Sequence, residues 1–182
     1  MTATLSLPEK ILAIDEALDV ADVPHAFGGA LALAWCTQRA RGTIDIDVNV
    51  FVDVDRAREV VEALPSAIVW TAADLELVER DGQVRIWWDT TPVDIFLNTT
   101  EFHSQVAGRA RRELFMDRSV PFLSCSDLAV FKAFFNRTKD WADLEEMATA
   151  GTLDLDRVVG ILVRYLGADD DRIERLLTLG SL

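Results

Sequence analysis

The amino-acid sequence predicts an α/β (α+β) fold, in which a mixed sheet flanked by helices is followed by a C-terminal helical part. Residues 43–52 alternate polar and apolar side chains, as a half-buried strand does, and other short strand-like segments alternate with helical ones over the first two thirds of the chain. From residue 124 onward the apolar spacing is helical. We therefore expect an α/β core over 1–123 and a helical part over 124–182, packed together in one structural domain.

The first third of the chain predicts a helix, a strand, a second helix and a second strand. Apolar residues recur at roughly helical spacing over 8–22, and His25-Ala26-Phe27 is typical of a short buried strand that ends at Gly28-Gly29. Residues 30–39 are rich in helix formers. In the strand at 43–52, one face carries apolar residues and the other polar ones. The apolar face holds Ile44, Ile46, Val48, Val50 and Val52, and the polar face holds Thr43, Asp45, Asp47 and Asn49.

The remaining elements follow the same two periodicities. Residues 55–64 form an amphipathic helix that Pro65 closes, whereas 71–81 fit either a helix with a Thr71–Asp74 capping box or a strand. Further elements are expected as strands at 83–88, 93–97 and 120–123, a helix at 101–112, a helix capped by Ser124 or Ser126, and helices from Trp141 onward with breaks near Gly151 and Gly167.

The charge of the chain restricts its partners. A formal net charge of -13 argues against unspecific binding of nucleic acid. One segment departs from this, since seven basic residues stand against three acidic ones between Arg109 and Lys139. The basic residues are Arg109, Arg111, Arg112, Arg118, Lys132, Arg137 and Lys139. A polyanion can dock there, although a solvated helix face explains Arg109–Arg112 equally well.

Neither a membrane span nor a secretory signal is recognisable. No stretch approaches the roughly 20 apolar residues that a spanning helix needs, and the N-terminus lacks a basic segment followed by an apolar one. Cys36 and Cys125 have no metal-type partner at short spacing, so we expect two ordinary buried thiols. These features predict a soluble cytoplasmic protein with no membrane partner.

Three aspartates are the strongest candidates for a chemical function. Asp45 and Asp47 are two residues apart on one strand, so their side chains share a face about 6.6 Å apart at a rise of ~3.3 Å per residue. Asp94 lies in another predicted strand and joins them if the two strands are neighbours. Such carboxylates repel one another unless a cation lies among them, which predicts a Mg²⁺ or Mn²⁺ site. The alternative is that each aspartate occupies the solvent face of its strand.

The segment before these aspartates suits a phosphate group. Gly28-Gly29 between a strand and a helix lets phosphate oxygens approach backbone N–H groups at the positive end of the helix. Arg41 is able to reach a triphosphate, and Thr43 to brace the loop or the start of the strand; a surface charge and a cap are the other interpretations. Lys132 interrupts the apolar run VFKAFF, so it either extends from a buried helix to solvent or points into a site.

Three motifs together resemble the nucleotidyltransferase superfamily. The run GGALALAWCTQRARGTIDIDV is similar to its glycine pair, short helix and Arg-x-Thr-x-Asp-x-Asp element, and PVDIF resembles the strand that bears its third carboxylate. SCSDLAVFKAFFNRTKDWADLEEM is similar to a segment of the nucleotidyltransferase toxins of bacterial toxin–antitoxin and abortive-infection systems. The resemblance covers about residues 25–147, with Gly29 in the place where many members have serine.

The resemblance implies a nucleotidyltransferase-like sheet and a set of roles. Asp45, Asp47 and Asp94 bind the metal, and Asp94 completes the site or activates the attacking hydroxyl. Lys132 and Asp140 correspond to residues that position the nucleotide and assist the chemistry. Nucleotide contacts are expected from Gly28, Gly29, Arg41, Thr43 and Lys132.

The expected activity is transfer of a nucleoside monophosphate from a nucleoside triphosphate, ATP among them, with release of pyrophosphate. The resemblance points to RNA as the acceptor, in particular the 3′ end of tRNA, and to a cognate antitoxin as a partner. The alternatives are a small-molecule hydroxyl, a protein hydroxyl, or a non-catalytic member of the fold with a regulatory role.

Overall fold

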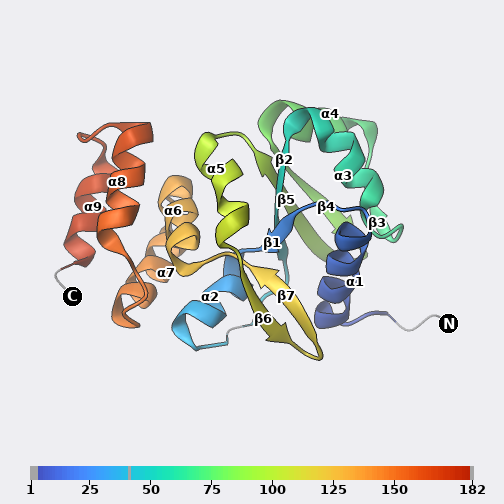
Figure 1. Cartoon of the computed structure of the whole chain (residues 1–182), viewed down its shortest axis with the longest axis horizontal. Coiled ribbons are helices and arrows are strands. Elements are labelled where there is room, and N and C mark those ends of the chain that lie inside the picture. Colours follow the sequence, from blue (N-terminus) through green and yellow to red (C-terminus); the bar gives the residue numbers. More distant parts are fainter. Residues whose placement is uncertain (1–3, 41, 181–182) are drawn as a thin grey trace. The chain divides into compact units, whose positions relative to one another are not determined.

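The computed structural model describes residues 4–40 and 42–180, and the chain divides into two compact units. The first consists of Met1–Gly28 and Gly42–Phe122, and the second of Gly29–Arg41 and Leu123–Leu182. The first holds the sheet with its helices, and the second is helical (Figure 1). The predicted fold class is therefore confirmed, whereas the expected domain division at 123/124 stays a prediction.

The sheet of the first unit is mixed. Over the described residues its seven strands have the order β3-β4-β5-β2-β1-β7-β6. They are β1 His25–Phe27, β2 Ile46–Asp53, β3 Ile68–Val69, β4 Gln83–Trp88, β5 Thr91–Asn98, β6 Arg111–Phe115 and β7 Arg118–Phe122. β2 runs parallel to β5, and β1 parallel to β7, while the other neighbours are antiparallel. Because β2 and β5 are parallel neighbours, they begin at the same edge of the sheet.

Helices precede and connect these strands. They are α1 Leu7–Val20, the 3-10 turn η1 Val54–Arg56, α3 Ala57–Ala63, α4 Ala72–Asp81, α5 Glu101–Val106 and the 3-10 turn η2 Ala107–Arg109. The segment that fitted either a helix or a strand is α4. The Thr71 hydroxyl accepts the Asp74 N–H, and the Asp74 carboxylate accepts the Thr71 N–H, so a capping box fixes the start of the helix. α5 packs on β2 and β5, and α1 contacts α3 and β7.

The core of the first unit lies on the apolar residues of the central strands. Ile46, Val48 and Val50 of β2 are fully buried, as are Val93 and Ile95 of β5. The polar residues of β2 and β5 alternate with them, so the apolar face of the sheet holds the functional strands at fixed positions.

The second unit is built from helices throughout its described residues. They are α2 Gly29–Thr37, α6 Cys125–Phe135, α7 Thr138–Thr149, α8 Leu155–Leu166 and α9 Asp171–Leu179. α2 packs against α6 and α7, and α8 packs against α6 and α9. Trp141 of α7 is buried, and its indole N–H donates to Asn136 Oδ1 at 2.7 Å. Ser124, rather than Ser126, caps α6, since its hydroxyl accepts the Asp127 N–H.

The expectation of two separate thiols is wrong. Cys36 of α2 and Cys125 of α6 form a disulfide, although 89 residues separate them in the sequence. The packing of α2 on α6 brings their Cα atoms to 5.5 Å, a normal distance for a disulfide. Spacing along the chain carries no information on this pair, because the contact is purely tertiary.

The structure also corrects several boundaries. The helix expected over 101–112 ends at Arg109, and residues 111–115 form β6. β6 forms a hairpin with β7, and the hydrogen bonds between these two strands outweigh the helical propensity of the segment. The strand expected from residue 43 begins at Ile46, because the Thr43 hydroxyl bonds to Asp45 and replaces the ladder locally. Ile44 is consequently 79% exposed and takes no part in the apolar face.

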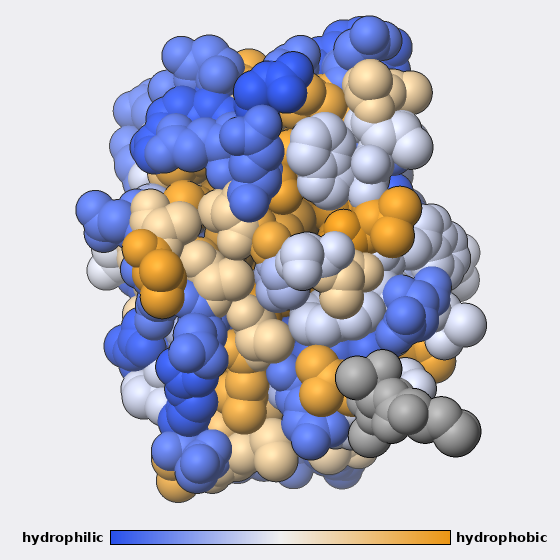
Figure 2. All heavy atoms as spheres, turned by 90° about the vertical axis from the view of Figure 1, so that its right-hand side faces the viewer, coloured by the Kyte–Doolittle hydropathy of each residue, from blue (hydrophilic) through white to orange (hydrophobic). Residues whose placement is uncertain are grey.

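The surface of the first unit mixes apolar and charged residues. Figure 2 shows the face at the right of Figure 1, where hydrophobic residues cross the middle of the view and hydrophilic ones border it. The exposed apolar side chains of this unit include Val20, Val69 and Trp87. Trp87 is half-exposed while its neighbour Trp88 is buried, as expected for adjacent residues of one strand. No helix in residues 4–40 and 42–180 is long and apolar enough to span a bilayer.

Candidate functional site

Two of the three predicted aspartates face each other across neighbouring strands. Asp47 is the second residue of β2, and its Cα partner on the parallel strand β5 is Asp94. Directly paired residues point to the same face of a sheet, so both carboxylates project from one side near the edge at which both strands begin. Both side chains are partly exposed, whereas the flanking Ile46, Val48, Val93 and Ile95 are buried.

Asp45 lies just before β2, in a turn that Thr43 organises. The Thr43 hydroxyl donates to Asp45 Oδ1 at 2.5 Å, and the Asp45 N–H reaches the same hydroxyl oxygen at 3.4 Å. Thr43 therefore braces the turn and fixes one oxygen of the Asp45 carboxylate, which was one of the two roles considered for it. The other oxygen of Asp45 is directed towards a cation on β4.

That cation is Arg85, which the sequence analysis missed. Its guanidinium donates to both oxygens of Asp94, at 2.7 and 2.6 Å, and lies 3.8 Å from Asp45 Oδ2. The hydrogen bonds to Asp94 raise the pKa of Arg85 above its ordinary value, and the charges of Asp94, Asp45 and Asp47 raise it further. The sequence does hold a signal for this contact. If β4 and β5 form a hairpin with a two-residue turn at Asp89-Thr90, the register of the hairpin pairs Arg85 with Asp94.

The residues fit a hard divalent cation. Arg85 shows that the three aspartates together attract positive charge, and their donor atoms are all carboxylate oxygens, which Mg²⁺ and Mn²⁺ prefer. The carboxylates of Asp45, Asp47 and Asp94 do not point to one common position, and both oxygens of Asp94 accept hydrogen bonds from Arg85. Among the described residues, the His, Cys, Asp and Glu side chains that do converge, with ligand atoms within 4.8 Å of one another, are Asp15, Asp19 and His25.

The glycine pair adjoins this edge of the sheet. The Gly28 N–H donates to the backbone oxygen of Asp47 at 2.9 Å, so the chain leaves β1 beside the aspartates. Gly29 follows with φ of +54°, which favours glycine, and begins α2. Arg41, the further phosphate contact expected from the sequence, lies outside the described residues.

Lys132 and Asp140 belong to the second unit, where they meet in a buried ionic cluster. Lys132 Nζ lies 2.5 Å from Asp143 Oδ2 and 3.7 Å from Asp140 Oδ1, and all three residues are buried. Asp140 also accepts hydrogen bonds from the backbone and side chain of Arg137, at the start of α7. Lys132 therefore does not extend to solvent but lies between two carboxylates. Asp143, the closer of the two, was not among the site residues predicted from the sequence.

The basic residues between Arg109 and Lys139 are divided between the two units, and several of them form ion pairs. Arg109, Arg111, Arg112 and Arg118 lie in the first unit, while Lys132, Arg137 and Lys139 lie in the second. Arg111 pairs with Glu113, Arg118 with Glu16, and Arg137 with Asp140. These ion pairs neutralise much of the excess positive charge on which docking of a polyanion was expected to depend.

The fold is similar to that of solved nucleotidyltransferases. The solution structure of the antibiotic-resistance factor ANT(2'')-Ia aligns over 87% of this chain and 92% of its own, with a TM-score of 0.60 and 14% identity. A crystal structure of ANT(2'')-Ia in complex with adenylyl-2''-tobramycin aligns over 94% and 95%, with a TM-score of 0.54 and 15% identity. The lincosamide antibiotic adenylyltransferase LnuA, with lincomycin bound, aligns over 81% and 99%, with a TM-score of 0.54 and 13% identity.

The comparison of sequences gives no match, either to a family model or to a curated protein. At 13–15% identity the structural similarity establishes the fold alone. The chain therefore has a nucleotidyltransferase fold, while the resemblance to the toxins stays a prediction from the sequence.

Proposed function

We propose that this chain is a metal-dependent nucleotidyltransferase whose reaction takes place at Asp45, Asp47 and Asp94. The observation that carries the proposal is the pairing of Asp47 with Asp94 on parallel strands, with Asp45 reaching the same cation as Asp94. A cluster of carboxylates on an apolar-backed sheet is unfavourable unless a cation binds there, so its presence in a nucleotidyltransferase fold supports a catalytic role.

In this proposal, Asp45 and Asp47 hold the divalent ion, with Thr43 fixing the orientation of Asp45. A bound divalent ion would neutralise triphosphate charge and stabilise the charge that develops on the leaving pyrophosphate. Gly29, at the start of α2, offers its backbone N–H to a phosphate oxygen, whereas the Gly28 N–H already donates to the backbone oxygen of Asp47. Arg41 and Lys132 remain the predicted side-chain contacts to the nucleotide.

Asp94 orients the acceptor hydroxyl and takes its proton as the acceptor oxygen attacks the α-phosphorus. A phosphorus–oxygen bond to the acceptor forms, the bond between the α-phosphorus and the β-phosphate oxygen breaks, and pyrophosphate leaves. Arg85 has to release Asp94 before the proton is transferred. This movement is inexpensive because the Arg85 side chain is 51% exposed, and solvent-exposed ion pairs contribute only about 0.2–1 kcal/mol.

A small molecule with a hydroxyl group is the acceptor that the structure supports best. The structurally similar proteins include ANT(2'')-Ia with adenylyl-2''-tobramycin and an adenylyltransferase of lincosamide antibiotics. The net charge of -13 favours a cationic acceptor over a polyanion, and ion pairs neutralise much of the basic segment. Both observations weigh against RNA.

Transfer to RNA, with a cognate antitoxin as regulator, is the second candidate. It rests on the resemblance of residues 124–147 to the toxin segment and on the cluster that Lys132 and Asp140 form there with Asp143. In this reading Lys132 exchanges one carboxylate contact for a phosphate. The same metal and triphosphate chemistry serves both candidates, so they differ only in the acceptor.

Label transfer distinguishes them. The purified chain is incubated with Mg²⁺, each α-labelled nucleoside triphosphate, and either tobramycin, lincomycin or total RNA. We expect label in a small molecule, with one pyrophosphate released for each label transferred. Label in RNA alone establishes the second candidate, and absence of transfer to all acceptors, together with absence of pyrophosphate, contradicts the proposed function.

Two variants test the assigned residues. Asp47→Asn should lower transfer at least about a hundredfold, and Asp94→Asn by about a hundredfold to ten-thousandfold. Asp53→Asn is the matched control, since Asp53 ends the same strand and is exposed. Wild-type transfer by Asp47→Asn would exclude Asp47 from the reaction.

A further inference from the structure

A second group of metal-ligating side chains lies in the first unit, away from the catalytic aspartates. Asp15 and Asp19 are one helical turn apart on α1, and His25 begins β1. One ligand atom from each of the three lies within 4.8 Å of the others. His25 pairs with Val50 of β2, whereas Gly28, beyond the other end of β1, bonds to Asp47, so the two groups lie at different positions along the strand.

Both ring nitrogens of His25 face oxygen atoms that accept hydrogen bonds. Its Nδ1 lies 3.0 Å from the backbone oxygen of Val23, and its Nε2 lies 3.2 Å from Asp15 Oδ1. Both partners are acceptors. A neutral imidazole has one N–H, so a donor at Nδ1 leaves the lone pair of Nε2 facing a carboxylate oxygen. A cation between Nε2 and Asp15 removes this conflict, and a histidine that binds metal typically donates its other N–H to a backbone carbonyl.

The distances suit a shared coordination sphere. Two ligand atoms about 2.1 Å from one tetrahedral zinc ion lie about 3.3 to 3.4 Å apart, close to the 3.2 Å between His25 Nε2 and Asp15 Oδ1. His25 and Asp15 are 6% and 1% exposed, so packing holds both in place. Asp19 is exposed, and its carboxylate has no hydrogen bond or ion pair to any other described residue, so it is free to rotate onto a cation.

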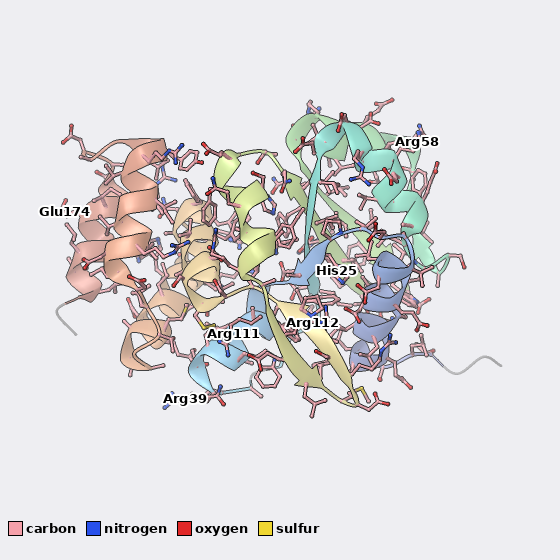
Figure 3. All side chains as sticks on the ribbon, viewed as in Figure 1. His25, Arg39, Arg58, Arg111, Arg112 and Glu174 are labelled. Carbon is pink, nitrogen blue, oxygen red and sulfur yellow. A yellow bond between two sulfur atoms is a disulfide. The ribbon has the colours of Figure 1, made fainter. Side chains whose placement is uncertain are left out.

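A cavity gives access to this group. It has a volume of about 280 Å³ and is lined by Asp19, His25, Pro24, Phe51, Arg112 and Pro121, among others. Figure 3 labels His25 and Arg112, which lie close together in that view. The Arg112 guanidinium donates to the backbone oxygen and hydroxyl of Ser119, so its own fold contacts hold it in the cavity wall. Two of the three metal-ligating residues therefore line this cavity, and of these Asp19 is exposed to solvent.

We propose that Asp15, Asp19 and His25 bind a divalent cation of intermediate softness, Zn²⁺ in the first instance, whose fourth coordination position faces this cavity. An imidazole nitrogen with two carboxylates favours Zn²⁺ over Mg²⁺, which prefers oxygen ligands alone. Three protein ligands and one open position are the arrangement of zinc sites that bind a further molecule. The site is independent of the proposed transferase reaction, since it shares no residue with it.

The alternative is a buried ion pair between a doubly protonated His25 and Asp15, with no metal. The two are distinguished by the ring nitrogens of His25. The chain has two histidines, so long-range proton–nitrogen NMR spectra of the chelator-treated protein at about pH 7.5 contain two imidazole systems. The variant His103→Gln identifies which of them is His25.

We expect one equivalent of zinc chloride to shift the Nε2 signal of His25 and leave Nδ1 protonated. Asp19→Asn should need at least about ten times more Zn²⁺ for the same shift, because it removes one ligand. Asp22→Asn is the matched control, since Asp22 is exposed, follows the same helix and stands outside the group. Asp47→Asn should also leave the response of His25 unchanged.

Three results would overturn the proposal. The first is a His25 signal that stays unchanged, with both ring nitrogens protonated, up to a tenfold molar excess of Zn²⁺. The second is an equal response of wild type and Asp19→Asn. The third is Zn²⁺ binding that disappears in Asp47→Asn, which would assign the metal to the catalytic aspartates instead. Because Asp19 is exposed, its variant is expected to fold, and a change in binding is then not a consequence of unfolding.

Discussion

Arg85 is the cation that holds the candidate site together, and replacing it with methionine tests that role. The variant Arg85→Met removes both hydrogen bonds to Asp94 and the charge 3.8 Å from Asp45, while keeping an apolar stem of similar shape. If the aspartates form a cation site, a divalent ion should replace the missing charge. The stability of the variant should then depend on Mg²⁺ more strongly than that of the wild type.

The expected magnitude follows from the exposure of the pair. The side chains of Arg85 and Asp94 are 51% and 15% exposed, and such ion pairs contribute about 0.2–1 kcal/mol. Removal of Arg85 takes away the guanidinium that contacts both Asp94 and Asp45, so we expect a loss of about 1 kcal/mol in a chelating buffer. For a chain of this size, that corresponds to a fall of about 2–4 °C in Tm. Millimolar Mg²⁺ should restore most of it.

The assay is thermal unfolding of both proteins with Mg²⁺ and with a chelator. Arg80→Met is the matched control, because Arg80 also makes two hydrogen bonds to one aspartate, Asp81, but on the exposed surface of α4. We expect the control to lose little stability, and to lose it equally in both buffers, because its ion pair is fully exposed to solvent. Equal stabilisation of wild type, Arg85→Met and Arg80→Met by Mg²⁺ would refute the cation site.

Three further outcomes follow from buried or crowded groups. Burial lowers the pKa of His103 from 6.5 to about 4, so between these pH values the native state binds fewer protons than the unfolded chain. The free energy of unfolding, measured by urea titration, should therefore fall by up to about 3 kcal/mol as the pH is lowered from 6.5 to 4. His103→Gln should show a smaller fall. Lys132→Met should cost about 3 kcal/mol, because it removes the cation 2.5 Å from the buried carboxylate of Asp143. Adding Asp143→Leu should recover much of this loss in the same titrations, and an equal loss in both variants would contradict the ion pair. Gly82→Ala should cost about 1–2 kcal/mol, because φ is +69° and the new Cβ would clash with Thr99 Cγ2. An unchanged Tm would contradict this geometry.

Much of the fold follows from local patterns. The alternation in residues 43–52 predicted β2, and Gly151 and Gly167 separate the C-terminal helices as expected. These signals lie within a few residues of the elements that they determine. The capping box at Thr71 left a helix and a strand open, and the structure decides for the helix α4. Asp94 was expected to join Asp45 and Asp47 on the condition that the two strands were neighbours, and β2 and β5 are neighbours.

Features that depend on tertiary contact were not predictable in this way. β6 forms because β7 supplies its partner, the Cys36–Cys125 disulfide depends on the packing of α2 against α6, and the two-residue β3 is too short to leave a pattern. The position of Arg85 was predictable in part, because a hairpin of β4 and β5 with a two-residue turn places it opposite Asp94. For the same reason the group of Asp15, Asp19 and His25, which joins a helix to a strand, was not expected.

Binding of a nucleoside triphosphate with Mg²⁺ tests the central claim most directly. Calorimetric titration of the triphosphate into wild type, Asp47→Asn and the control Asp53→Asn separates binding from the identity of the acceptor. The account predicts Mg²⁺-dependent binding that is lost in Asp47→Asn and retained in Asp53→Asn. Equal binding by wild type and Asp47→Asn would contradict it, because the carboxylates of β2 and β5 would then play no part in holding the nucleotide.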